Sequence, residues 1–178
     1  CSGKGVKERE SERENKVIIA AQPTRGVDIG AIEMIHNTIL HEKTKKKAIM
    51  VVSAELSEIM ALSDRIAVMY AGKIVESGLT DDIFYNPKHE YTKGLLKSIP
   101  KMYEADYERL VPIEGSPVDM LNPPKGCPFA SRCDSCMKIC LREMPPVKNF
   151  SDIHYSQCWL NEIEEDTNSE GGAACLKK

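Results

Sequence analysis

The fold of this chain is decided by the stretch Val17-Ile18-Ile19-Ala20-Ala21-Gln22-Pro23-Thr24-Arg25-Gly26-Val27-Asp28. Its first five residues form a continuous apolar run, which is typical of a buried strand in a parallel sheet. The strand should end at Gln22-Pro23, and Gly26 with Asp28 indicates a tight connection to the next element. A second apolar run, Ala48–Val52, predicts another buried strand further along the chain.

Helices are predicted on either side of the second run. Ile32, Ile35 and Ile39 recur with the period of a helix and would share one face. The lysine-rich stretch 43–47 suits the C-terminus of this helix, where positive charge meets the negative end of the helix dipole. A shorter helix is expected over residues 56–62.

A β-hairpin is predicted next, because strands at 65–70 and 73–76 flank the turn Ala71-Gly72. Two helical pieces, broken at Asn86-Pro87, should occupy residues 81–98. The succession of strand, helix, strand, helix and hairpin favours an α/β fold with short connections.

The chain is therefore expected to have five segments. They are a charged N-terminal segment (1–16), a partial α/β core (17–80), a helical connection with a linker (81–124), a loop-rich cysteine module (125–160) and a disordered acidic tail (161–178).

Composition limits the classes of protein to consider. The 178 residues are 42% hydrophobic and 29% charged, as in globular chains, and a net charge of −3 gives no reason to expect a nucleic-acid partner. No apolar run approaches the roughly 20 residues that span a bilayer. A soluble protein of a reducing compartment is expected, which argues against structural disulfides. Because the sequence starts at Cys1, we also expect it to be a fragment.

Five of the seven cysteines lie between Cys127 and Cys158. Four of them form the spacing C-x5-C-x6-C-x17-C, and Cys136 is left over; the four are Cys127, Cys133, Cys140 and Cys158. Disulfides, a tetrahedral zinc ion or an iron–sulfur cluster could hold thiols gathered so densely. Zinc sites favour closely spaced cysteine pairs, and only Cys133 with Cys136 offers one. From the residues alone, an iron–sulfur cluster, a zinc ion and free or oxidised thiols all stay open.

The front half of the chain resembles the ATPase subunits of ABC transporters. Residues 20–28 look like the Walker B and D-loop region, and residues 52–56 and 63–75 look like the switch region and the hairpin after it. Over residues 15–76 the sequence most resembles the second nucleotide-binding half of nucleoside and sugar importers. This resemblance implies the C-terminal part of a P-loop NTPase core.

The second half resembles a different branch of the same superfamily. Residues 82–96, 112–117 and 126–140 look like the end of oligopeptide and dipeptide importer ATPases. Glu90 stands where that family usually has proline, and Cys136 stands where a non-thiol residue is usual. The two resemblances meet near residue 76, which makes the chain look mosaic.

The resemblance also implies that the catalytic machinery is depleted. The family's magnesium-holding Asp, its water-orienting Glu and its switch His fall on Ala21, Gln22 and Ala54. Asp28 matches the D-loop Asp. No GxxxxGK[ST] phosphate-binding loop is present in the sequence. We therefore expect that this chain does not hydrolyse ATP on its own, and that ATP with magnesium is used only by an intact relative or with a partner.

In the peptide-importer branch, the C-terminal extension implies a [4Fe-4S] cluster, and by position its ligands would be Cys127, Cys133, Cys140 and Cys158. Cys1 and Cys175 are expected to be unliganded. His154 is expected to be a surface histidine, with a ligand role as the alternative. His36, His41 and His89 show no acidic or thiol partner in the sequence.

The function implied by the resemblance is that of an ATP-binding subunit in a peptide importer. Such a subunit would lie on the cytoplasmic face of the membrane, with permease subunits and a second ATP-binding subunit as partners. Two other interpretations stay open. One is a non-enzymatic module that binds an iron–sulfur cluster or zinc, and the other is a defective gene product whose sheet edges and apolar faces are exposed.

Overall fold

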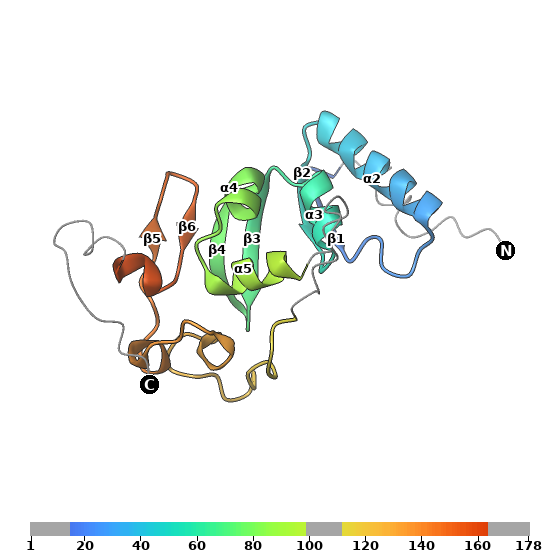
Figure 1. Ribbon diagram of the computed structural model, residues 1–178. Helices are drawn as coiled ribbons and strands as arrows, with labels where there is room; N and C mark the ends of the chain where they lie inside the picture. Colours follow the sequence, from blue (N-terminus) through green and yellow to red (C-terminus); the bar gives the residue numbers. More distant parts are fainter. Residues whose placement is uncertain (1–14, 99–111, 164–178) are drawn as a thin grey trace, which may run out of the picture. The chain divides into compact units, whose positions relative to one another are not determined.

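The computed structural model describes residues 15–98 and 112–163 (Figure 1). The predicted acidic tail from residue 164, the first part of the linker (99–111), nearly all of the charged N-terminal segment, and both Cys1 and Cys175 lie outside these residues. The chain forms two compact units that divide between Ser63 and Asp64. The division falls inside the range 17–80, which the sequence analysis treats as one segment.

The first unit contains the parallel strand pair that the apolar runs predict. Strands β1 (Val17–Ala21) and β2 (Ala48–Val52) pair in register, from Val17 opposite Ala48 to Ala21 opposite Val52 (Figure 1). Helix α2 (Ile29–Thr44) joins them, and helix α3 (Leu56–Leu62) follows β2. The two strands, their parallel pairing and both helices are confirmed.

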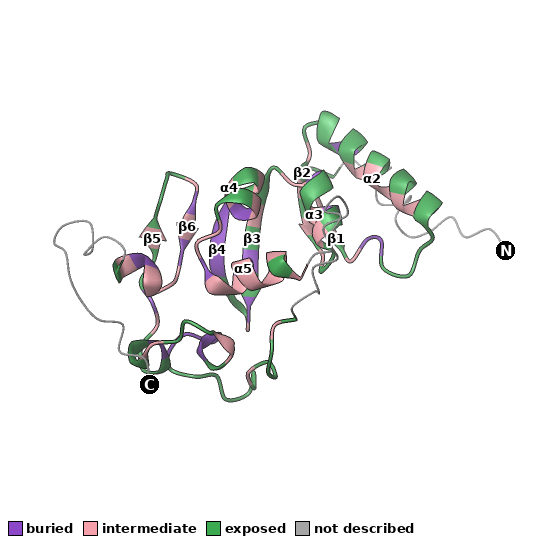
Figure 2. Cartoon of the chain, viewed as in Figure 1, coloured by how far each residue is buried: buried purple, intermediate pink, exposed green. Residues whose placement is uncertain are grey.

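The prediction that these strands are buried is wrong for the structure described. Both strands alternate between exposed and half-buried residues (Figure 2). Ile19 is 66% exposed. One face of the strand pair is covered by no other described element of the first unit, so its apolar side chains are exposed within that unit. We call this surface the open strand face; it consists of Val17, Ile19, Met50 and Val52.

The second unit begins with the predicted hairpin. Strand β3 (Arg65–Tyr70) pairs antiparallel with β4 (Lys73–Leu79), which is three residues longer than expected. Ala71 and Gly72 both have positive φ angles, 47° and 74°, as the tight hairpin turn requires. The helical region that follows is confirmed as two pieces on either side of Asn86-Pro87. They are α4 (Thr80–Tyr85) and α5 (Glu90–Lys97).

The cysteine-bearing segment adds two strands to the hairpin. It first forms two short 3-10 helices, η1 (Ala130–Arg132) and η2 (Lys138–Leu141), and then β5 (Lys148–Asn149) and β6 (Tyr155–Ser156). Strand β6 pairs antiparallel with β4, which gives the sheet order β3-β4-β6-β5 (Figure 1). The sequence analysis did not predict this pairing, because two-residue strands carry no periodic signal.

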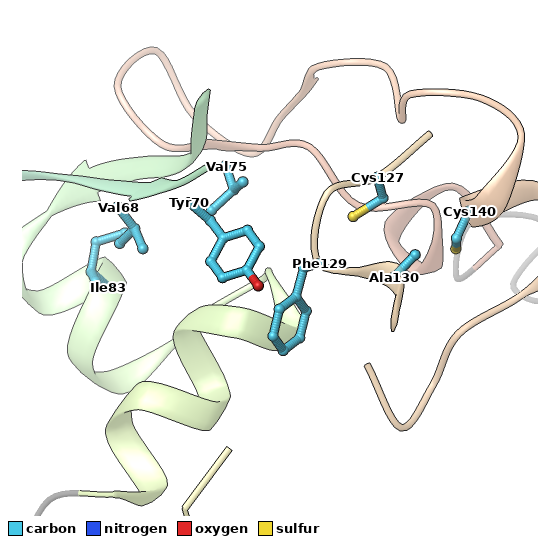
Figure 3. Close-up of a cluster of buried hydrophobic side chains, with 8 residues drawn as sticks. All are labelled: Val68, Tyr70, Val75, Ile83, Cys127, Phe129, Ala130 and Cys140. Carbon is cyan, nitrogen blue, oxygen red and sulfur yellow. The ribbon is translucent and has the colours of Figure 1, made fainter. Parts of the chain in front are cut away.

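One apolar core joins the hairpin to the cysteine-bearing segment. Figure 3 shows Tyr70 of β3 directed toward Phe129, and their rings meet edge to face with centroids 5.4 Å apart. The buried members of the core are Val68, Tyr70, Val75, Ile83, Cys127, Phe129, Ala130 and Cys140 (Figure 3). The cysteine-bearing segment therefore packs as part of the second unit.

A buried carboxylate lies at the centre of the second unit. Glu76 on β4 is fully buried and accepts hydrogen bonds from the backbone N–H groups of Lys88 (2.6 Å) and His89 (3.0 Å). The Nε2 atom of His154 lies 3.1 Å from Glu76 Oε1 and donates the third bond. His154 is only 2% exposed, so the expectation of a surface histidine is wrong. Its residue type is polar, but the carboxylate of a distant strand supplies the partner that makes burial favourable.

We expect the substitution Glu76→Ala to lower the free energy of unfolding by about 3–5 kcal/mol, because it leaves two backbone donors and a histidine buried without an acceptor. Urea unfolding followed by circular dichroism measures this change. Lys73→Ala, at an exposed position of the same strand, is the control and should alter the free energy by less than about 0.5 kcal/mol. Equal effects of the two substitutions would contradict the central role of Glu76.

Candidate functional site

The three positions that the resemblance assigns to the ATPase machinery lie at one edge of the first unit. Ala21 ends β1, Gln22 follows it, and Ala54 comes two residues after the end of β2. The backbone N–H of Gln22 donates to the carbonyl of Val52 over 2.7 Å, which holds the two strand ends together. The carboxyl ends of parallel strands are where α/β folds bind ligands. The three side chains carry no charge, so none of the three could hold magnesium as a carboxylate does or accept a proton.

Asp28 has a clear structural role next to this edge. It is the N-cap of α2, and its Oδ1 atom accepts a hydrogen bond from the backbone N–H of Ala31 over 2.9 Å. An N-cap carboxylate satisfies a donor that the helix leaves free and favours helix formation. Its role toward a nucleotide stays a prediction.

The structure brings the four spaced cysteines of the second unit to one cavity. The walls of this thiol cavity include Cys127, Cys133, Cys140 and Cys158 together with His89 and Glu90 of the α5 N-terminus. Cys136 does not line the cavity and is exposed. The separation of the four-cysteine set from Cys136, which the sequence spacing suggests, therefore agrees with where the side chains lie.

A glycine makes part of this convergence possible. The backbone N–H of Cys127 donates to the carbonyl oxygen of Cys140 over 2.8 Å, which brings two segments of the wall together. A Cβ atom on Gly126 would lie 2.1 Å from that same carbonyl oxygen. Only glycine allows so close a backbone approach.

All five cysteines in the described residues are free thiols. Within residues 15–98 and 112–163, no three histidine, cysteine or acidic side chains stand in an arrangement that would hold a metal ion. The donor set nevertheless suits a sulfur-ligated group, because four thiols share one cavity. The structure thus gathers the predicted ligands without forming a metal-binding arrangement.

Burial governs the chemistry of the cavity thiols. It raises the pKa of Cys127 to about 11, opposed by a backbone hydrogen bond from Phe129, and raises the pKa of Cys133 to about 12, opposed by one from Ser135. The pKa of Cys158 is raised as well, again mainly by burial. The Cys127 and Cys133 thiols are therefore protonated at neutral pH, and an electron-withdrawing group such as a metal would be needed to make them thiolates.

Two residues of the thiol cavity wall, His89 and Glu90, were not predicted from the sequence. His89 is 1% exposed and Glu90 is half-buried, and both start α5. His89 Nδ1 accepts the backbone N–H of Tyr91 over 3.0 Å, while its Nε2 atom has no hydrogen-bond partner among the described residues. Burial lowers the pKa of His89 to about 4, so the ring is neutral at neutral pH. Only the general preference of polar residues for N-cap positions could have hinted at His89.

His36 also gains a partner that the sequence does not reveal. Its Nε2 atom lies 3.4 Å from an oxygen of the buried Glu58, on α3 of the same unit. This contact joins α2 to α3. Among the helices that the structure describes, none is long and apolar enough to cross a membrane.

The thiol pKa values predict a loss of stability at high pH. An ordinary thiol titrates near 9.0, whereas Cys127 and Cys133 in the fold titrate near 11 and 12. Between these values the unfolded chain binds fewer protons than the folded chain, so the free energy of unfolding falls as pH rises through this range. Below pH 9.0 the contribution is fully present.

Denaturant titrations at about pH 8 and about pH 10.5 measure this dependence. The double variant C127S/C133S, which has no thiol at these positions, should show a clearly smaller loss between the two pH values. An identical loss in the double variant would show that other groups cause it.

The sequence is similar to known proteins of peptide transport. Residues 75–140 match the family model described as oligopeptide/dipeptide transporter, C-terminal region. The chain is 39% identical over 150 residues to the dipeptide transport ATP-binding protein DppD of Bacillus subtilis, which covers 84% of this chain and 44% of that protein. It is 42% identical over 147 residues to the oligopeptide transport ATP-binding protein OppD of the same organism, covering 82% of this chain and 41% of the relative. The oligopeptide transport ATP-binding protein OppD of Escherichia coli is 36% identical over 146 residues, covering 81% and 42%.

These matches run through both halves of the chain. A match of 150 residues in a chain of 178 necessarily includes residues 29–150. The resemblance of residues 15–76 to nucleoside and sugar importers is not shown, since peptide-transport proteins account for that region as well. A mosaic origin is therefore not needed. The chain spans less than half the length of the curated relatives that it matches.

Proposed function

We propose that this chain, which is similar to the ATP-binding proteins of oligopeptide and dipeptide transport, is part of the ATP-binding subunit of a peptide importer. The observation that carries the proposal is the continuous similarity to DppD and OppD across both structural units. In the intact subunit, ATP hydrolysis would drive peptide uptake. The partners would be permease subunits and a second ATP-binding subunit, at the cytoplasmic face of the membrane.

The open strand face supports this proposal. Four apolar side chains of one strand pair are exposed, with Val17 and Met50 both 57% exposed. Parallel strands occur almost only in sheets that are covered on both faces. The relatives are more than twice as long as the matched part of this chain, so they contain residues that could cover such a face.

As it stands, the chain supplies little of the hydrolysis chemistry. When bound, magnesium would neutralise charge on the transferring phosphate, and it requires carboxylate or hydroxyl ligands. Ala21 and Ala54 have neither, and Gln22 cannot act as a base. We propose that the intact subunit binds ATP with low hydrolytic activity, or relies on a partner for a complete site.

A chimera tests this proposal. The part of Bacillus subtilis DppD that precedes its match would be fused to the whole of the present chain. We expect a soluble, cooperatively unfolding protein with ATP hydrolysis close to background. The triple substitution Ala21→Asp, Gln22→Glu and Ala54→His should raise the hydrolysis rate by about a hundredfold or more, because it supplies a metal-holding carboxylate, a base and a phosphate contact.

The control is Asp81→Asn, an exposed position of α4 in the second unit, whereas the three altered residues belong to the first; it should leave the rate unchanged. Failure of the triple variant to gain activity, in a chimera that unfolds cooperatively, would contradict the proposal. Aggregation of every chimera would favour the interpretation as a defective gene product.

A second candidate function is favoured by the thiol cavity. We propose that Cys127, Cys133, Cys140 and Cys158 hold a [4Fe-4S] cluster, with zinc as the alternative. The support is that one cavity collects four thiols and leaves Cys136 out. A bound cluster would supply a structural or redox-sensitive brace between the segments that carry its ligands. The residues of the cavity wall would exclude water from the cluster and hold the four sulfur atoms in position.

Metal analysis after anaerobic purification tests this second function. A cluster predicts about four irons and four acid-labile sulfides per chain, with an absorption band that fades on reduction. Substitution of any one of the four cysteines by serine should remove most of the iron, whereas Cys136→Ser should retain it. About one zinc ion without sulfide would support the alternative. The absence of both metals from the purified and reconstituted chain would overturn the metal-binding function.

A further inference from the structure

The wall of the thiol cavity contains a histidine, His89, that has a ring nitrogen without a hydrogen-bond partner among the described residues. The Nε2 atom of His89 is buried and has no hydrogen-bond partner among the described residues, although the side chain lines the same cavity as the four thiols. A buried polar atom without a partner costs about 1–3 kcal/mol, so such an atom in a native fold requires an explanation. It marks a place where an acceptor belongs.

The hydrogen bonds around His89 fix which nitrogen carries the proton. Nδ1 accepts the backbone N–H of Tyr91 over 3.0 Å, so Nδ1 has a lone pair there and no hydrogen. In the neutral ring the hydrogen must then lie on Nε2, which becomes a donor. The backbone of His89 is held as well, because its N–H donates to the buried carboxylate of Glu76 over 3.0 Å.

The chemistry of the wall decides what kind of acceptor fits. The cavity wall presents thiol sulfur, the side chain of Ser135 and apolar groups such as Phe129, whose ring centroid lies 6.1 Å from that of His89. Glu90 also lines the cavity, but its carboxylate is paired with Lys93 over 2.8 Å. A protonated thiol is a weak acceptor, whereas a thiolate or sulfide bound to metal carries negative charge and accepts strongly.

We infer that His89 is a positioning residue whose Nε2–H donates a hydrogen bond to a metal-bound sulfur in the thiol cavity, and so tunes the group that the four cysteines hold. This inference rests on the second proposed function, a cluster held by those cysteines. A hydrogen bond to cluster sulfur stabilises the reduced, more negative state and raises the reduction potential. His89 therefore links the buried network around Glu76 to the redox behaviour of the cluster.

The substitution His89→Asn separates this role from a structural one. Asparagine is a good N-cap, so its side-chain oxygen can still accept the Tyr91 N–H, but the shorter side chain removes the donor from the Nε2 position. Thr92→Val is the matched control. Thr92 is 1% exposed, its hydroxyl also has no partner in the described residues, and it does not line the cavity.

The experiment uses the whole chain reconstituted anaerobically with ferrous iron and sulfide. Iron and sulfide content and the midpoint potential are measured for the wild type, His89→Asn and Thr92→Val. We expect equal cluster content in all three proteins and a more negative potential for His89→Asn alone. At a fixed potential, the ratio of oxidised to reduced cluster in that variant should rise about tenfold, which corresponds to about 59 mV for a one-electron couple.

Two results would overturn the inference, and they are distinguishable. A wild-type chain that takes up no iron and sulfide would overturn the cluster and the role of His89 together. A loaded wild type and a loaded His89→Asn variant with the same potential would overturn only the role of His89. If Thr92→Val shifted the potential equally, the effect would belong to general packing of α5, which also contradicts the inference.

Discussion

The second unit depends on the satisfaction of one buried carboxylate. Glu76 is fully buried, and its carboxylate is stabilised by two backbone N–H groups and the ring of His154. These three donors come from the loop before α5 and from the turn before β6. A single side chain on β4 therefore fixes where the helical region and the cysteine-bearing segment meet the hairpin. The place of His89 in the wall of the thiol cavity is held by the same arrangement, because its backbone N–H donates to Glu76.

The two units differ in how completely they bury their apolar residues. The second unit packs Tyr70, Val75 and Phe129 into a continuous core. The first leaves a row of apolar side chains on the open strand face. The same contrast appears in their chemistry, because Ala21, Gln22 and Ala54 at the strand ends of the first unit are uncharged, whereas four thiols share one cavity in the second. Of the two, the second has more of what a working site requires.

Much of the fold could be predicted from local patterns. The apolar runs at β1 and β2, the Ala71-Gly72 turn and the break at Asn86-Pro87 each carry a strong local signal, and the four-cysteine set could be separated from Cys136 by spacing. The pairing of β6 with β4 and the burial of His154 could not be predicted, because both depend on Glu76, which lies 78 residues before His154 in the chain. The role of His89 was hidden for the same reason. Its significance comes from cysteines that the sequence places far away.

The pairing of β6 with β4 also has a consequence for how the chain is made. Two residues of β4, Glu76 and Ser77, pair with a strand that begins at Tyr155, about 76 residues after Leu79. At a translation rate of roughly 5–20 residues per second, roughly 4–15 s pass between the synthesis of β4 and the synthesis of that strand. During this interval β4 presents unpaired backbone groups, which are a template for strands of other chains. Nascent-chain protection by chaperones would matter most in this interval, and a ribosome pause within it would favour misassembly.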